Sequence, residues 1–189
     1  MDESLCAALS VARILNALEV RWFLGGSLAS SVHGVPRATL DANIVADLRP
    51  VHIKPLLRDL GSEWYADEGA IRAAIESRSS FNLIHLVSAM KADVFLPKLR
   101  RFDGGQFARA CLTPVSEETG TEIPVCAAED IIVAKLEWFR LGQETSERQW
   151  SDILGVMRIN KGGLDIDLLR ENALELGVMD LLEKVLAAA

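Results

Sequence analysis

Two short stretches organise the front of this chain: Leu24-Gly25-Gly26-Ser27, and Gly34-Val35-Pro36-Arg37-Ala38-Thr39-Leu40-Asp41-Ala42-Asn43. Residues 21–24 predict a short buried strand that the two glycines end, and residues 27–32 predict a brief helix. Bare backbone N–H groups and the Ser27 hydroxyl then meet a helix N-terminus, which favours an anion. The pattern predicts a phosphate-binding turn, and a tight turn without a ligand is the alternative.

The second stretch leads into a predicted strand over residues 39–47, where apolar and polar side chains alternate. Asp41 and Asn43 are two residues apart, so both side chains should project from the same face of the strand. Oxygen ligands grouped in this way suit a hard cation such as Mg²⁺, which keeps water and substrate phosphates in its other positions.

A third oxygen-bearing side chain, Asp93, lies inside the apolar run from Met90 to Leu96. Burial of a carboxylate costs free energy unless the group is paired or bound to a metal. Two interpretations follow. Asp93 either joins the oxygen ligands of the strand over 39–47, or is neutralised by Lys91 or an arginine.

The rest of the sequence predicts an α/β (α+β) domain over residues 1–126 and a C-terminal helical subdomain over 127–189 packed on it. Helices are expected at 4–18, 50–60 and 67–77, the last capped by Asp67, and then at 127–142, 146–160, 165–176 and 178–187. Residues 81–87 and 91–96 predict a hairpin. Val115 and residues 123–125 predict short edge strands, because Pro124 cannot donate to a central ladder.

Composition limits the class of protein. The chain has 189 residues, 50% apolar and 25% charged, which is typical of a globular protein with its own core. Three scattered cysteines, the lack of a leader pattern and the lack of a long apolar run favour a cytoplasmic protein that does not span a membrane. The net charge of −7 argues against a general polyanion binder. The local cluster Lys98, Arg100, Arg101 and Arg109 is either a solvated helix face or a phosphate-facing patch.

Taken together, these stretches resemble the nucleotidyltransferase-fold proteins of the abortive-infection (AbiEii-like) toxin type and the minimal nucleotidyltransferases. In that family a GG or GS turn is followed by R-x-[ST]-x-D-x-D, and a third carboxylate lies on a later strand. Residues 129–136 and 148–153 resemble the family's helical lysine and R-x-x-x-D segments. The resemblance covers about residues 20–155 and implies a small mixed sheet with flanking helices, followed by the helical segment.

The resemblance also implies a site and a reaction. It assigns nucleotide binding to Gly25, Gly26, Ser27, Arg37 and Thr39, catalysis to Asp41, Asp93, Lys135 and Asp152, and metal binding to Asp41, Asn43 and Asp93. The implied reaction is transfer of a nucleoside monophosphate from a nucleoside triphosphate, with Mg²⁺ or Mn²⁺, to a hydroxyl on RNA such as tRNA, on protein or on a small molecule. An antitoxin protein is an expected partner.

One position departs from the family pattern. Asn43 stands where the second carboxylate of D-x-D is expected, so the site has one negative charge fewer beside a divalent cation. The alternative hypothesis is therefore a catalytically degenerate nucleotidyltransferase fold that binds a nucleotide or a protein.

Overall fold

The computed structural model describes residues 3–116 and 120–189, and the chain divides into two compact units. The first unit contains the chain up to Leu28 together with Ala38–Val125. The second contains Ala29–Arg37 together with Cys126–Ala189. The chain therefore enters the second unit twice, first for nine residues and later for the C-terminal helices.

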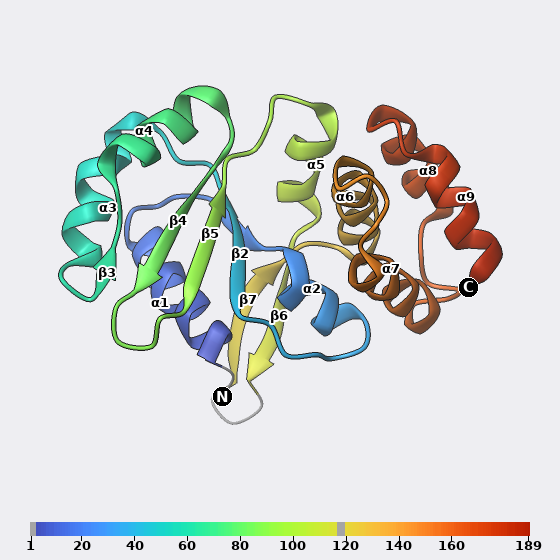
Figure 1. Ribbon diagram of the computed structural model, residues 1–189, viewed down its shortest axis with the longest axis horizontal. Helices are drawn as coiled ribbons and strands as arrows, with labels where there is room; N and C mark the ends of the chain where they lie inside the picture. Colours follow the sequence, from blue (N-terminus) through green and yellow to red (C-terminus); the bar gives the residue numbers. More distant parts are fainter. Residues whose placement is uncertain (1–2, 117–119) are drawn as a thin grey trace. The chain divides into compact units, whose positions relative to one another are not determined.

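A mixed sheet forms the centre of the first unit, with the strand order β3-β4-β5-β2-β1-β7-β6 (Figure 1). The strands are β1 (Trp22–Leu24), β2 (Asp41–Ala46), β3 (Trp64–Tyr65), β4 (Ser80–His85), β5 (Lys91–Phe95), β6 (Cys111–Ser116) and β7 (Thr121–Val125). β2 runs parallel to β5, whereas β1 and β4 run antiparallel to their central neighbours. The sheet is the mixed type expected from the sequence.

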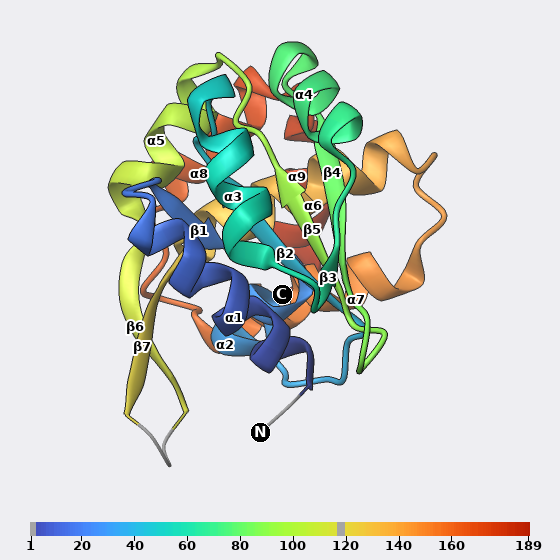
Figure 2. The same ribbon diagram turned by 90° about the vertical axis from the view of Figure 1, so that its left-hand side faces the viewer.

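Alternation along β2 and β5 separates a buried face from a polar one. Ala42 and Ile44 of β2 and Ala92 and Val94 of β5 are buried. They lie on the face that contacts α1, whose own buried side chains include Leu15 (Figure 2). Because side chains on a strand point alternately to opposite faces, the intervening polar residues project from the other face of the sheet.

Helices complete the first unit. Their bounds are α1 (Glu3–Ala17), the start of α2 (Gly26–His33), α3 (Ile53–Leu60) after the short 3₁₀ turn Pro50–His52, α4 (Glu68–Ser77) and α5 (Arg101–Arg109). Asp67 caps α4 as expected, since its side chain accepts a hydrogen bond of 2.6 Å from the Ala70 N–H.

The edge prediction for Pro124 is wrong. β7 lies between β1 and β6, not at the margin of the sheet. It meets β1 only where Val125 pairs with Leu24, one residue beyond the proline. The missing N–H of Pro124 therefore costs no hydrogen bond to β1. The hairpin prediction is confirmed, because β4 and β5 pair antiparallel.

The second unit is helical, as the sequence predicts. It contains the C-terminal part of α2 together with α6 (Ala128–Leu141), α7 (Glu147–Ile159), α8 (Ile166–Glu175) and α9 (Met179–Ala188). Side chains of Ser146 and Asp165 cap α7 and α8. Each helix turns apolar residues into the core of this unit, among them Leu136, Ile153 and Leu182.

Residues 29–37 are held to these helices by specific contacts. The His33 ring bonds through Nε2 to the carbonyl oxygen of Cys126 at 2.7 Å. Asn160 Nδ2 donates to the His33 carbonyl at 2.7 Å. Gly34 lies so close to Val156 that an added Cβ would meet its methyl group at 3.0 Å. A histidine that the sequence suggested was structural therefore joins two distant segments. Among the described residues, no helix is both long enough and apolar enough to cross a bilayer.

Candidate functional site

Two carboxylates on the polar face of the sheet share one cation. The register pairs Asp41 with Lys91 and Asn43 with Asp93, so all four side chains project from one face of β2 and β5. The Lys91 Nζ lies 3.6 Å from Asp41 Oδ1 and 3.2 Å from Asp93 Oδ2. The Asp93 side chain is 14% exposed and that of Asp41 is 44% exposed. Asn82 of β4, opposite Asp93 in register, donates to Asp93 Oδ1.

These ion pairs keep Lys91 charged. Burial opposes the charge, but the hydrogen bonds and negative charges of Asp93 and Asp41 outweigh it and raise the pKa of Lys91. The ammonium is therefore protonated at neutral pH. Of the two sequence interpretations of Asp93, neutralisation by Lys91 is what the structure shows, on the same face as Asp41.

The glycine turn lies against Asn43. The Gly25 N–H donates to the Asn43 carbonyl at 2.9 Å. Gly26 has a φ of +58°, and a Cβ built on it would lie 2.6 Å from Cβ of Asn43 and closer still to the amide. Only glycine fits here, because both the left-handed backbone and the close approach of Asn43 exclude a side chain. Thr39 is nearby in sequence, and its hydroxyl contacts the Asp41 carbonyl at 3.4 Å.

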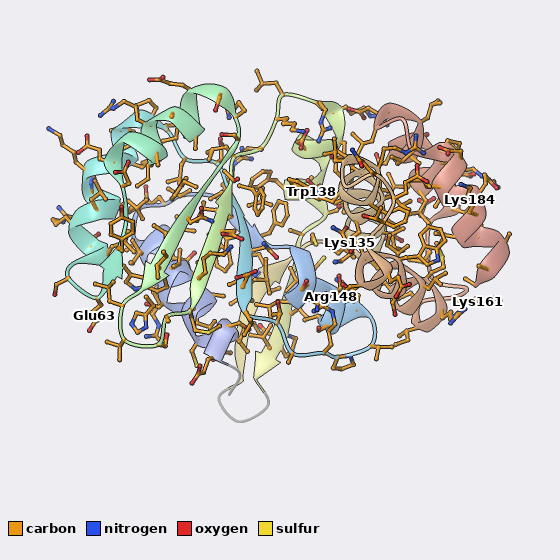
Figure 3. All side chains as sticks on the ribbon, viewed as in Figure 1. Glu63, Lys135, Trp138, Arg148, Lys161 and Lys184 are labelled. Carbon is orange, nitrogen blue, oxygen red and sulfur yellow. The ribbon has the colours of Figure 1, made fainter. Side chains whose placement is uncertain are left out.

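A second cluster lies in the helical unit and joins Arg37, Lys135 and Asp152. Arg37 Nε and Nη2 donate to the two oxygens of Asp152 at 2.8 and 2.9 Å. Lys135 Nζ, on α6 (Figure 3), donates to Asp152 Oδ2 at 2.9 Å. The side chains of Lys135 and Asp152 are 8% and 7% exposed, whereas that of Arg37 is 26% exposed. Two cations thus face one carboxylate, which leaves an excess positive charge.

The pKa shifts in this cluster follow from burial and hydrogen bonding. Burial lowers the pKa of Lys135, and the hydrogen bond to Asp152 offsets this only in part. Burial opposes ionisation of Asp152, but hydrogen bonds from Arg37 and Lys135 outweigh it and lower the pKa of that carboxyl. Both oxygens of Asp152 are engaged, so its structural effect is to hold Arg37 and Lys135 in place.

The two groups of predicted site residues are each internally assembled. The strand residues Asp41, Asn43 and Asp93 share one face with the glycine turn, all in the first unit. Arg37, Lys135 and Asp152 form one cluster in the second unit. Their assigned roles in binding and catalysis stay predictions. The sequence analysis treated Lys91 only as a counter-ion, and it missed Asn82. The period of two along β4 and β5 places both on the polar face, but only the strand pairing brings them to Asp93.

The strand face fits one divalent cation. The Lys91 ammonium is a stand-in cation, and its position shows that Asp41 and Asp93 converge on positive charge. Mg²⁺ is commonly held by one or two carboxylates plus substrate phosphates. These two carboxylates and the Asn43 amide oxygen meet that requirement. In residues 3–116 and 120–189, no three His, Cys, Asp or Glu side chains gather to hold an ion, so phosphate oxygens would have to complete the ligand set.

Other residues singled out in the sequence have structural partners. Arg100 forms a two-pronged ion pair with Asp103 at 2.6 and 3.0 Å at the start of α5. The basic cluster is thus anchored on a helix, although this does not decide between its two interpretations. Cys6 and Cys111 are exposed and Cys126 is buried, and all three are free thiols.

Comparison with solved structures defines the class of fold. The lincosamide antibiotic adenylyltransferase LnuA, bound to lincomycin, is 17% identical, with a TM-score of 0.53 over 84% of this chain and 98% of that chain. The antibiotic-resistance factor ANT(2'')-Ia is 10% identical, with a TM-score of 0.54 over 100% of this chain and 96% of that chain. A candidate nucleotidyltransferase from Thermotoga maritima is 18% identical, with a TM-score of 0.50 over 80% and 96%. The chain has the nucleotidyltransferase fold.

Sequence comparison adds nothing to this class. No family model matches the chain, and no curated protein matches it. The abortive-infection subtype therefore has no support beyond the motifs. At the low identities of the structural neighbours the likeness establishes the fold, and any reaction has to be inferred from the residues of the site.

Proposed function

We propose that this protein is a nucleotidyltransferase that moves a nucleoside monophosphate from a nucleoside triphosphate to an acceptor hydroxyl. The observation that carries the proposal is the convergence of Asp41 and Asp93, from the neighbouring parallel strands β2 and β5, on a single cation. In the reaction, the acceptor oxygen forms a bond to the α-phosphorus, pyrophosphate leaves, and the hydroxyl proton is released to water.

Asp41 and Asp93, with the Asn43 amide oxygen, would hold one Mg²⁺ or Mn²⁺. When bound, that ion would neutralise charge on the triphosphate. Asp93 is fixed for this role by Asn82, whose amide donates to one of its oxygens. Asp41 is more exposed, and its described ion pair is the one to Lys91. It can therefore turn toward an incoming ligand with less loss.

The glycine turn and the basic cluster supply the proposed phosphate contacts. Gly25, Gly26 and Ser27 lead into α2, where backbone N–H groups and the helix dipole favour an anion. Arg37 and Lys135 carry more positive charge than Asp152 neutralises, and the planar guanidinium suits a phosphate. Asp152 acts as the residue that positions these two cations.

The acceptor class follows from the neighbours only as a first choice for testing. LnuA is described as acting on a lincosamide, and a second structure of ANT(2'')-Ia holds adenylyl-2''-tobramycin. A small-molecule hydroxyl is therefore the first acceptor to test here, before tRNA or protein. A cytoplasmic location, a toxin role and an antitoxin partner are proposed on the sequence and its family resemblance alone.

Asn43 favours a second candidate function, nucleotide binding without catalysis. The site has two carboxylates rather than three, and both are engaged by Lys91. A fold that keeps the phosphate contacts but loses the charge needed for an active metal would bind a triphosphate and release it unchanged.

The deciding experiment is labelled transfer with a matched control. The purified chain is incubated with each α-labelled nucleoside triphosphate, Mn²⁺ or Mg²⁺, and pools of small molecules, tRNA and cell extract. Transfer is expected in the wild type and in Lys54→Gln, which alters an exposed residue of α3, and is expected to be lost in Asp41→Ala. Equal transfer by Asp41→Ala would refute the role of the strand face. Triphosphate binding without transfer in any pool would favour the second candidate.

A further inference from the structure

The Lys91 ammonium lies at the point where the two carboxylates of the strand face converge. Its register partner on β2 is Asp41, and Asp93 follows two residues later on the same face of β5. The distances from Nζ to the two carboxylates are 3.6 and 3.2 Å. On its other side, Lys91 pairs in register with the apolar Ile84 of β4. The carboxylates are thus the groups on this face that attract the ammonium.

A divalent ion bound by Asp41 and Asp93 would compete with Lys91 for the same oxygens. Both pairs of oxygens cannot serve two neighbouring cations without strong repulsion between them, because like charges a few ångströms apart disfavour each other. The Lys91 side chain is 37% exposed and ends a flexible four-carbon stem. It can therefore leave the carboxylates when another anion is available to accept it.

We propose that Lys91 is an internal competitor for the divalent cation, which keeps the free protein from binding the ion until a phosphate anion accepts the ammonium. This inference rests on the proposed function for its second half, since the triphosphate is the anion that would accept Lys91. The first half concerns this chain alone. The ion and the triphosphate then bind together, and the ion by itself binds weakly.

The competition is tested by binding of Mn²⁺ alone, without nucleotide or turnover. The full chain is titrated with Mn²⁺ at low salt, and free ion is measured by electron paramagnetic resonance. Two partly exposed ion pairs are broken when the ion displaces Lys91, so Lys91→Gln should bind Mn²⁺ roughly tenfold more tightly than the wild type. Lys91→Met, a second charge-free variant, should show the same gain.

Two controls separate local competition from general charge. Lys91→Arg keeps the positive charge and should bind Mn²⁺ as weakly as the wild type. Lys54→Gln removes one positive charge from an exposed position of the same unit and should also leave Mn²⁺ binding unchanged. The proposal is overturned if Lys91→Gln binds Mn²⁺ no more tightly than the wild type, or if Lys91→Arg gains as much as Lys91→Gln.

Thermal shifts with ATP as the probe distinguish the inference from the proposed function. The wild type should be stabilised by Mn²⁺ with ATP but little by Mn²⁺ alone, whereas Lys91→Gln should be stabilised by Mn²⁺ alone. If ATP, CTP, GTP and UTP stabilise no variant while Lys91→Gln still gains Mn²⁺ affinity, competition by Lys91 stands and nucleotidyl transfer fails. If the triphosphates stabilise the wild type with and without Mn²⁺ equally, linked binding through Lys91 is refuted.

Discussion

Replacement of Asp152 by Asn tests whether the basic cluster is a structural unit. Asp152 accepts three hydrogen bonds, at 2.8, 2.9 and 2.9 Å, from Arg37 and Lys135. Its side chain and that of Lys135 are almost fully buried. Asp152→Asn removes the negative charge but keeps the shape, so it leaves a buried ammonium without a counter-ion.

The expected loss is large relative to the stability of a domain. Breaking a buried ion pair by removing one partner costs roughly 3–5 kcal/mol, against a typical total of about 5–15 kcal/mol. For a chain of this length that loss lowers the melting temperature by roughly 6–20 °C. The control is Asp180→Asn. Asp180 accepts two hydrogen bonds from Arg140 but its side chain is 60% exposed, so the loss should stay below about 1 kcal/mol.

The pH dependence of the effect has a definite sign. Burial opposes ionisation of Asp152, but the hydrogen bonds from Arg37 and Lys135 outweigh it and hold the folded-state pKa below the ordinary value. A carboxyl with a lowered pKa stabilises the fold fully above its unfolded pKa, about 4 for aspartate, and loses that contribution as pH falls through the folded pKa. The stability difference between wild type and Asp152→Asn should be constant from about pH 8 to 5 and shrink below about pH 4.

Urea unfolding of single and double variants measures these quantities. Lys135→Met combined with Asp152→Asn should be less destabilised than the sum of the two single variants, with a coupling of at least about 1 kcal/mol. If Asp152→Asn costs no more than Asp180→Asn, or if the two cluster variants are additive, the cluster is not the buried ion-pair unit inferred from its geometry.

Three further changes test individual contacts. Gly26→Ala should cost roughly 2–5 kcal/mol in urea unfolding, from a φ of +58° and the overlap with Asn43, whereas Gly177→Ala, with a φ of +68° and open space around it, should cost only about 1–2 kcal/mol; equal losses would show that the contact with Asn43 does not matter. Asn43→Asp adds a carboxylate to the strand face and should tighten Mn²⁺ binding several-fold and raise any transfer rate, and an unchanged Mn²⁺ affinity would contradict the assignment of Asn43 as a ligand. Asp67→Ala removes the cap of α4 and should cost about 1 kcal/mol, with an unchanged melting temperature as the contrary result.

Much of the sheet could be predicted because its signals are local. The alternation in residues 41–46 identified β2 and placed Asp41 and Asn43 on one face. The same reasoning marked Asp93 as a carboxylate that needs a partner. The partner itself was one of several options, because the parallel pairing of β2 with β5 is a long-range feature that no local pattern encodes.

Elements without a strong local signal were missed. β3 contains only Trp64 and Tyr65, which is too short for a period to be recognised. α5 contains Gly104 and Gly105, which disfavour a helix, and it is supported instead by the buried Phe102 and the ion pair of Arg100 with Asp103. The boundary expected near residue 126 also contained no sign that residues 29–37 would join the helical unit.

That joining of residues 29–37 to the C-terminal helices affects how the protein can be made. The hydrogen bonds from Arg37 to Asp152 and from Asn160 to His33 span 115 and 127 residues of chain. At synthesis rates of roughly 5–20 residues per second, the early segment waits roughly 6–25 s on the ribosome for its partners. An amino-terminal fragment that stops at residue 126 would never acquire them. The second unit is thus completed only after nearly the whole chain has been translated, and neither unit can be exchanged as a continuous cassette in a fusion protein.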